Sequence, residues 1–188
     1  MIYLIRHGKT EANEKHLYCG SRDISLSDLG KKELGRLSYK VRNPRFFTSG
    51  MKRTNETLKV LFGDVKYKEV PDLKEIDFGA FEMKSYDELK DNPEYIKWIS
   101  GDNEANTPPA GESGKAMKAR VMPAFYHLQS LDVPGEDIVI ITHGGVIAGI
   151  METLFPEEGK NLYEWQPVPG HGYAVADGGY REIPSNCE

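Results

Sequence analysis

Apolar positions along the chain fall into short continuous runs separated by longer stretches of helical spacing. Residues 2–5 and 138–141 are apolar at every position, which is typical of strands buried on both faces of a sheet. Residues 45–48 and 67–70 predict two further short strands. Because the runs alternate with helical segments, we expect a mostly parallel sheet with helices on both faces.

Helical spacing is clear in four segments. Residues 27–41 place apolar side chains three and four positions apart after Ser27, which suits an N-cap. Residues 52–62, 113–131 and 144–155 show the same periodicity. Each of these segments predicts a helix that packs one face against the sheet.

The last part of the chain predicts an antiparallel edge. Residues 173–176 and 180–183 flank Asp177-Gly178-Gly179, a sequence typical of a hairpin turn. The elements together predict an α/β fold, a three-layer α/β/α sandwich with a mostly parallel sheet and an antiparallel edge. We expect residues 1–188 to form a single domain.

The segment 72–113 is less regular than its surroundings. Ser85 and Glu88 fit a capping box before one short helix, and Pro93 suits the start of another. A long excursion of this kind often covers or lines a substrate pocket, although it can also be plain surface covering. We interpret residues 72–113 as a lid-like excursion.

Composition narrows the function classes. The 188 residues include 24 Lys and Arg against 29 Asp and Glu, a net charge of −5, which lacks the basic field that supports nucleic-acid binding. Cys19 and Cys187 lie at opposite ends without metal-ligand spacing, so we expect free thiols and no metal. No apolar run approaches the roughly 20 residues of a membrane span. These observations predict a cytoplasmic protein without nucleic-acid or membrane partners and without a cofactor.

Two histidines mark the candidate site. His7 and His143 each follow a predicted buried strand, and each is followed by glycine. In open α/β sheets, ligands bind beyond the carboxyl ends of the strands. A single histidine after a strand is more often a structural hydrogen-bonding residue, but two in the same setting favour a shared site if their strands are neighbours.

The residues around these histidines resemble a known family. Arg6-His7-Gly8-Lys9-Thr10 with Asn13 is similar to the R-H-G-x-T-x-x-N signature of the histidine phosphatase superfamily, the phosphoglycerate mutase-like proteins. Further segments resemble this family's motifs, in the same order and over nearly the whole chain: 49–54 ending near Arg53, 73–79 with Glu75, 111–113, and 142–145 with His143. The resemblance implies the phosphoglycerate mutase-like fold.

The resemblance also implies roles for individual residues. His7 would be the nucleophile, with a backbone carbonyl holding the proton on its other ring nitrogen. Arg6 and Arg53 would bind phosphate with their planar guanidinium groups, and they should lower the pKa of His7 and keep it neutral. His143 and Asn13 would be further phosphate contacts.

Glu75 takes the role of proton donor to the leaving alcohol, by its position in the motif. It could then act as the base for the water that hydrolyses the phosphohistidine. The alternative is an ordinary surface charge, since other acidic residues surround it in the sequence. Arg22 resembles a substrate-side arginine of some family members. The predicted substrate-binding residues are therefore Asn13, Arg22 and Gly144.

Hydrolysis of a small phosphorylated metabolite is the resulting interpretation, with α-ribazole 5'-phosphate or a sugar phosphate as substrate. The short chain looks more like the small bacterial phosphatases, including α-ribazole phosphatases, than like the longer phosphoglycerate mutases. Two alternatives stay open: phosphoryl transfer of the mutase type, and a catalytically weak phosphate-binding regulatory module.

Overall fold

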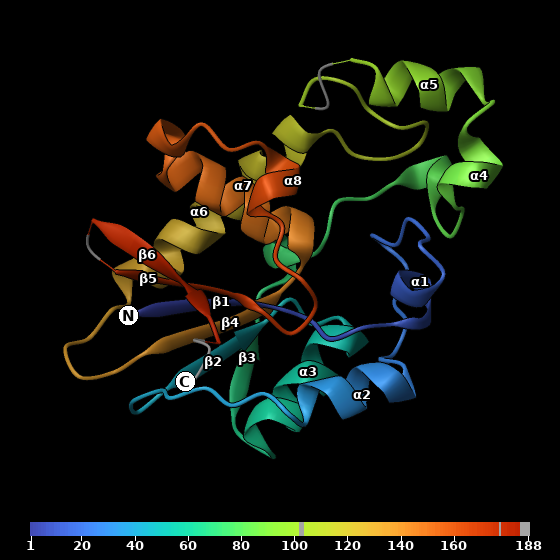
Figure 1. Ribbon diagram of the computed structural model, residues 1–188. Helices are drawn as coiled ribbons and strands as arrows, with labels where there is room; N and C mark the ends of the chain where they lie inside the picture. Colours follow the sequence, from blue (N-terminus) through green and yellow to red (C-terminus); the bar gives the residue numbers. More distant parts are fainter. Residues whose placement is uncertain (102–103, 177, 185–188) are drawn as a thin grey trace.

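A computed structural model describes residues 1–101, 104–176 and 178–184. Within these ranges the strands form a six-stranded sheet in the order β3-β2-β4-β1-β5-β6 (Figure 1). The strands are β1 (Ile2–Arg6), β2 (Arg45–Thr48), β3 (Tyr67–Glu69), β4 (Ile138–Thr142), β5 (Gly172–Ala176) and β6 (Gly179–Ile183). β1 to β4 run parallel, whereas β5 is antiparallel to β1 and to β6. The predicted mostly parallel sheet with an antiparallel edge is confirmed.

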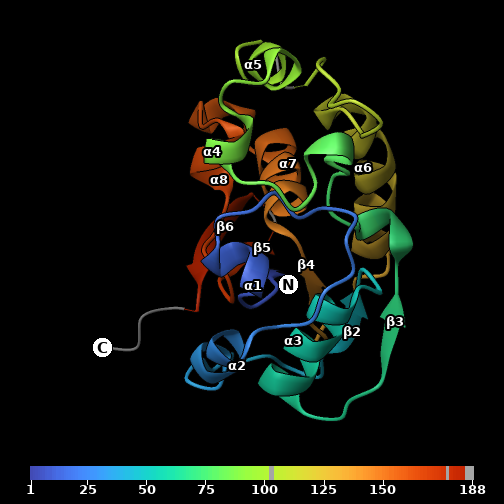
Figure 2. The same cartoon turned by 90° about the vertical axis from the view of Figure 1, so that its right-hand side faces the viewer.

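Helices cover both faces of the sheet. They are α1 (Glu11–Glu14), α2 (Asp28–Leu34), α3 (Lys52–Phe62), α4 (Tyr86–Leu89), α5 (Pro93–Ile99), α6 (Gly114–Ser130), α7 (Gly144–Leu154) and α8 (Leu162–Trp165). Figures 1 and 2 show α6 and α7 over one face and α2 and α3 over the other. This arrangement confirms the three-layer fold.

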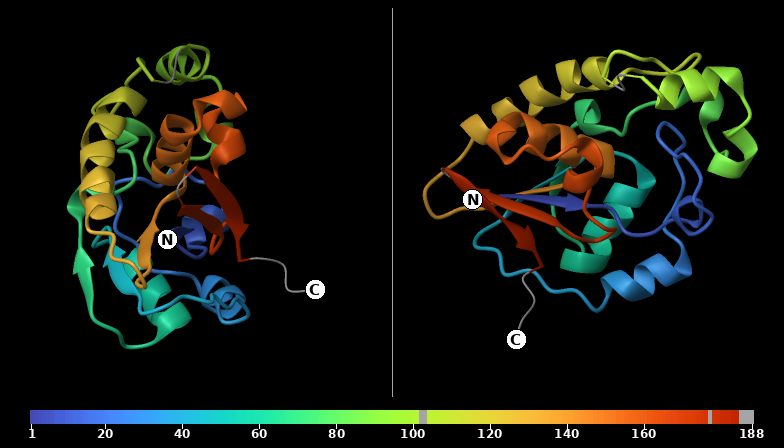
Figure 3. Two further views of the ribbon diagram at one scale, coloured as in Figure 1. Left: turned by 90° about the vertical axis from the view of Figure 1, so that its left-hand side faces the viewer. Right: turned by 45° about the horizontal axis from the view of Figure 1, so that its top comes forward.

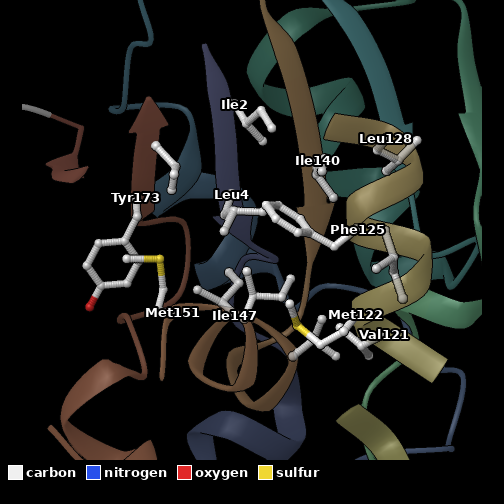
Figure 4. Packing of buried hydrophobic residues seen from close by; sticks show 14 of the residues in the cluster. Ile2, Leu4, Val121, Met122, Phe125, Leu128, Ile140, Ile147, Met151 and Tyr173 are labelled. Atoms are coloured by element: carbon white, nitrogen blue, oxygen red, sulfur yellow. The ribbon is translucent and has the colours of Figure 1, made fainter. Parts of the chain in front are cut away.

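Alternate residues of the central strands enter two different cores. Leu4 and Ile140 point to the side of α6 and α7, where they meet Phe125 and Ile147 (Figure 4). Their neighbours in sequence point the other way, where Ile5 packs in a cluster with residues of α3. Both faces of these strands therefore need apolar side chains, which is why the two runs in the sequence are uninterrupted.

The helix predicted for residues 27–41 is shorter than expected. Ser27 caps its start as predicted, accepting a hydrogen bond from the backbone N–H of Gly30, but the helix ends at Leu34. Gly35 forms the C-cap, and glycine is a poor residue with which to extend a helix. Val41 still packs against the core from a loop, so apolar spacing continued beyond the end of the helix.

The excursion 72–113 has its own small core in its described part. The capping box of Ser85 and Glu88 is present at α4. Phe81, Leu89, Tyr95 and Trp98 form a separate hydrophobic cluster. Figure 3 shows the excursion's helices α4 and α5 at the end of the molecule towards which β1 points. Its interpretation as a lid stays a prediction.

The remaining sequence predictions divide between described and other residues. β5 and β6 pair as the hairpin strands, but Asp177 of the turn lies outside the described residues. Cys19 is a free thiol, whereas Cys187 lies outside the described residues. In the described part of the chain, no helix is both long and apolar enough to cross a membrane.

Candidate active site

The two histidines meet because their strands are neighbours. β1 and β4 pair in parallel with Arg6 opposite Thr142, and the ladder continues one step further as the backbone N–H of His7 donates to the Thr142 carbonyl at 2.9 Å. The imidazole ring centroids of His7 and His143 lie 5.2 Å apart. The pairing register thus brings together two residues that are far apart in the sequence.

The His7 ring has one engaged and one reactive nitrogen. Nδ1 lies 2.7 Å from the carbonyl oxygen of Gly8, and because a carbonyl only accepts, Nδ1 carries the proton and Nε2 keeps its lone pair. Burial is the largest cause that lowers the pKa of His7, followed by the charges of Arg53 and Arg6. From the sequence, only the arginines were expected to lower this pKa; the direction is right, but burial is the larger cause.

Gly8 brings this carbonyl close to the ring. A Cβ at Gly8 would lie 2.5 Å from a methyl carbon of Leu34 in α2, closer than atoms can approach. The Gly8 N–H donates to Thr57 Oγ1 at 2.9 Å. The loop after β1 is therefore fixed against both α2 and α3, and with it the orientation of His7.

His143 is completely buried in a chain of hydrogen bonds. Arg53 Nε donates to His143 Nδ1 at 3.3 Å, so the proton lies on Nε2, which donates to Ser49 Oγ at 2.8 Å. Burial first, then the charge of Arg53, lowers the pKa of His143. This histidine is neutral, and protein groups engage both of its ring nitrogens in this structure.

Arg53 lies in the first turn of α3 and is also completely buried. Besides its bond to His143, its guanidinium donates from Nη1 to the Arg22 carbonyl and from Nη2 to the Gly20 carbonyl, both at 2.7 Å. Three bonds in different directions fix the plane of the guanidinium. A lysine could not reproduce this arrangement, because an ammonium group offers no planar set of donors.

Arg6 lies at the carboxyl end of β1. Its Nη1 donates to the Pro167 carbonyl at 2.7 Å. Its Nε is buried and has no hydrogen-bond partner among the described residues. An unsatisfied buried donor costs about 1–3 kcal/mol, so an oxyanion bound next to Arg6 would relieve this cost.

Glu75 is held at the start of α7. Its Oε2 accepts from the Gly145 N–H and its Oε1 accepts from the Ile76 N–H, both at 3.0 Å. A Cβ on Gly145 would lie 2.6 Å from Oε1, so the glycine allows the carboxylate to approach. These two bonds fix the position of the carboxyl group.

The three predicted substrate-binding residues differ in how they lie relative to the site. The Oδ1 atom of Asn13 accepts from Thr10 at the cap of α1, and Asn13 lines a cavity. Arg22 has an exposed side chain, and its carbonyl accepts from Arg53 Nη1. Gly145 rather than Gly144 lines the cavity. The binding roles of Asn13, Arg22 and Gly144 stay predictions.

The cavity has a volume of about 250 Å³ and a lining of two kinds. Its polar side chains are those of Arg6, Asn13, Glu75 and Gln166, and we call the first three, together with His7, Arg53 and His143, the phosphate end. Its aromatic side chains, which we call the aromatic wall, are those of Tyr18, Phe78, Trp98 and Tyr163. A larger cavity of about 790 Å³ lies at the amino ends of β1 and β4 and contains none of the motif residues, so size does not identify the site.

The aromatic wall was not predicted from the sequence. Tyr18 packs against Phe78 and Trp98 with ring centroids 5.2 and 5.6 Å apart. The density of aromatic residues in the excursion was the available signal, but aromatic residues at helical spacing more often form a core. Among residues 1–101, 104–176 and 178–184, no group of three or more His, Cys, Asp or Glu side chains is placed to hold a metal ion.

Comparison with known proteins identifies the family. A family model described as the histidine phosphatase superfamily (branch 1) matches residues 2–175, which includes all the site residues described above. The chain belongs to the histidine phosphatase superfamily. As a member of this superfamily it is an enzyme.

Individual relatives of this histidine phosphatase differ in activity. It is 28% identical over 181 residues to the adenosylcobalamin/alpha-ribazole phosphatase of Salmonella typhimurium, covering 93% of this chain and 89% of that protein. It is 30% identical over 179 residues to a 2,3-bisphosphoglycerate-dependent phosphoglycerate mutase of Mesorhizobium japonicum, covering 86% and 84%. The alpha-ribazole phosphatase structure from Shigella flexneri has a TM-score of 0.80 at 25% identity, covering 95% of this chain and 92% of that one.

Proposed function

We propose that this histidine phosphatase hydrolyses small phosphate monoesters through a phosphohistidine at His7. The observation that carries the proposal is the free lone pair of His7 Nε2, whose pKa the nearby charges of the buried Arg53 and the half-buried Arg6 lower, while Arg6 and Glu75 line one cavity. Nucleophile, cations and proton donor are the parts that phosphoryl transfer requires.

In the first step, Arg6 and Arg53 bind the phosphoryl oxygens and His7 Nε2 attacks phosphorus. The bond from phosphorus to the ester oxygen breaks, and Glu75 gives its proton to that oxygen, which leaves as an alcohol. The hydrogen bond from Nδ1–H to the Gly8 carbonyl stabilises the positive charge that the ring acquires. The arginines compensate the charge on the equatorial oxygens.

In the second step, water attacks the phosphorus of the phosphohistidine. Glu75, now a carboxylate, takes the proton from the water, and the electron pair of the broken N–P bond returns to His7 Nε2. Phosphate leaves, and both residues are restored. No step needs a metal or a cofactor, and we propose that the enzyme works without either, in the cytoplasm and not on nucleic acid.

The aromatic wall supports a substrate whose alcohol part carries a flat apolar ring. Among the described residues that line the cavity, Arg6 is the only cation. The carboxylate of a phosphoglycerate would therefore find no second cation there, whereas a ring system would stack on Trp98 or Tyr18. This favours an ester of the α-ribazole 5'-phosphate type over a sugar phosphate or a phosphoglycerate.

Phosphoglycerate mutase activity is the second candidate, supported by the relatives that carry that name. It uses the same first step, but a second phosphoglycerate hydroxyl would replace water. A regulatory module that binds phosphate without turnover is the third, and the presence of both His7 and Glu75 disfavours it.

One experiment separates these activities. The enzyme is mixed with an aryl phosphate labelled in the phosphoryl group, quenched in alkali, and the label on the protein and in free phosphate is followed with time, with and without chelator. We expect labelled wild type, no label on the His7→Ala variant, and release of phosphate that the chelator does not affect. Label that moves to added phosphoglycerate faster than to water would indicate a mutase. Full turnover by His7→Ala would reject the phosphohistidine.

A further inference from the structure

Arg120, on the middle of α6, makes hydrogen bonds with every N–H of its guanidinium. Nη1 donates to the carbonyls of Asp72 and Lys74, both at 2.8 Å. Nη2 donates to the Glu75 carbonyl at 3.1 Å and to Glu112 Oε2 at 2.7 Å, while Nε donates to Glu112 Oε1 at 2.8 Å. With all five donors in use, Arg120 has none left for a substrate.

The carbonyl groups of the segment that ends in Glu75 depend on side chains for their hydrogen bonds. The carbonyl of Leu73 accepts from Thr142 Oγ1 at 2.7 Å. Together with the three bonds from Arg120, this means that the carbonyls of residues 72–75 all accept from a side chain. Beyond the short turn at Pro71–Leu73, no helix or strand of the described structure fixes these residues.

Glu112, near the C-terminal end of the excursion, orients Arg120. It holds the guanidinium through both carboxylate oxygens, and its own N–H donates to the Asp77 carbonyl at 2.8 Å. Glu112 and Arg120 are half-buried, with 18% and 24% of their side chains exposed. The ion pair also offsets the charge of Arg120, so its effect on Glu75 is one of geometry.

We propose that Arg120, oriented by Glu112, is a positioning residue for the proton transfer by Glu75. It fixes the backbone so that the carboxylate stays on the Gly145 N–H and faces the leaving oxygen. This inference rests on the proposed function. Misplacement of a catalytic group by about 1 Å can cost on the order of 100-fold in rate.

The test compares two leaving groups in single and double variants. Arg120→Met keeps the length of the apolar stem but removes the donors. We expect it to lower kcat for alkyl phosphates by about 10- to 100-fold and for aryl phosphates by a few-fold, because a good leaving group needs little protonation. Arg120→Lys should restore part of the loss. Lys115→Met, an exposed residue at the start of the same helix, is the matched control and should change neither rate.

The double variant distinguishes positioning from general damage. In a Glu75→Gln background, Arg120→Met should lower kcat hardly further, because the proton donor is already gone. An undiminished loss in the Glu75→Gln background would overturn the proposal.

A second measurement does not depend on the reaction. The amide proton of Gly145 reports its bond to the Glu75 carboxylate, and in Arg120→Met we expect its chemical shift to move towards that of Glu75→Gln. An unchanged Gly145 amide in Arg120→Met would also overturn the positioning role. A moved amide without any dependence on the leaving group would instead reject the acid role of Glu75 in the proposed function.

Discussion

The phosphate end and the aromatic wall of the cavity are built in different ways. The phosphate end grows from the paired strands β1 and β4 and the first turn of α3, and its His143 and Arg53 are completely buried. The aromatic wall comes from loops, the excursion and α8, and its Tyr163 is 74% exposed. Under the proposed function, the reaction chemistry depends on backbone that a strand ladder fixes, and substrate selection on segments outside the sheet, which can vary without disturbing the chemistry.

The phosphate end and the aromatic wall also differ in charge. The phosphate end holds the arginines and neutral histidines, whose pKa values burial and the arginines lower. In the wall, burial and the hydroxyl of Tyr95 raise the pKa of Tyr18, so Tyr18 stays a neutral phenol. The wall therefore contributes contact area rather than charge.

The largest effect is expected at the phosphate end, where every substrate presents the same group. Arg53→Lys should lower kcat/KM by about 100- to 1,000-fold. The factor should be the same for aryl phosphates, alkyl phosphates and nucleoside-like phosphates that carry an aromatic base. Steady-state kinetics on such a panel checks this, with Lys59→Met on the exposed side of α3 as control. A loss of kcat/KM that varies strongly with the alcohol part of the substrate would show that the phosphate end and the aromatic wall do not act separately.

The next effect concerns Glu75, the carboxyl group of the phosphate end. Glu75→Gln should lower kcat for alkyl phosphates by about 100-fold and for aryl phosphates by no more than about 10-fold, since only poor leaving groups need the proton. A plot of log kcat against the pKa of the leaving alcohol would become steeper in the variant. An unchanged slope would remove Glu75 from the role of acid.

A smaller, selective effect is expected at the wall. Tyr163→Ala should raise KM for a phosphate ester with an aromatic ring by about 5- to 10-fold and leave inhibition by inorganic phosphate unchanged. Tyr126→Ala, which alters an exposed tyrosine of α6, is the matched control. Weaker binding of inorganic phosphate in Tyr163→Ala would show that the wall also shapes the phosphate end.

The smallest effect is on stability in acid. His7 and His143 have lowered pKa values in the folded state, so below about pH 6.5 the unfolded chain binds more protons. Their stabilising contribution is present above that pH and is lost as the pH falls, by at most about 1.4 kcal/mol per pH unit for each group. Urea unfolding between pH 7 and 5 measures this, and His143→Gln should flatten the dependence. The exposed His127→Gln should not; an equal slope in both variants would contradict the assignment.

The sequence predicted the strand ends well because their pattern has a single physical cause. A strand buried on both faces must be apolar throughout, as residues 138–141 are. The residue that follows such a strand must lie at the carboxyl end of the sheet. His7 and His143 could therefore be placed before any contact was known. The end of α2 was misplaced because Val41 is apolar for a reason other than helix packing: it covers the core from a loop.

Contacts made by the backbone left no such pattern. The carbonyls of residues 72–75 accept hydrogen bonds from Arg120 and Thr142. Because every residue has a carbonyl, nothing in the sequence predicts these hydrogen bonds. Likewise, the carbonyl of Arg22 accepts from Arg53 Nη1 while its side chain is exposed. The motif placed this residue near the site, but it could not show which of its atoms would be used.

The sequence alone determined the central strands and the positions of the two histidines at their carboxyl ends, because strand burial acts over a few neighbouring residues. The chemistry proposed for the histidines came from the resemblance of their motifs to the family. The tertiary structure decided the tautomers of His7 and His143, the anchoring of Glu75 and the aromatic wall around Trp98. These features join residues from distant segments, and which hydrogen bonds and ring contacts form depends on how the helices and the excursion pack around the sheet.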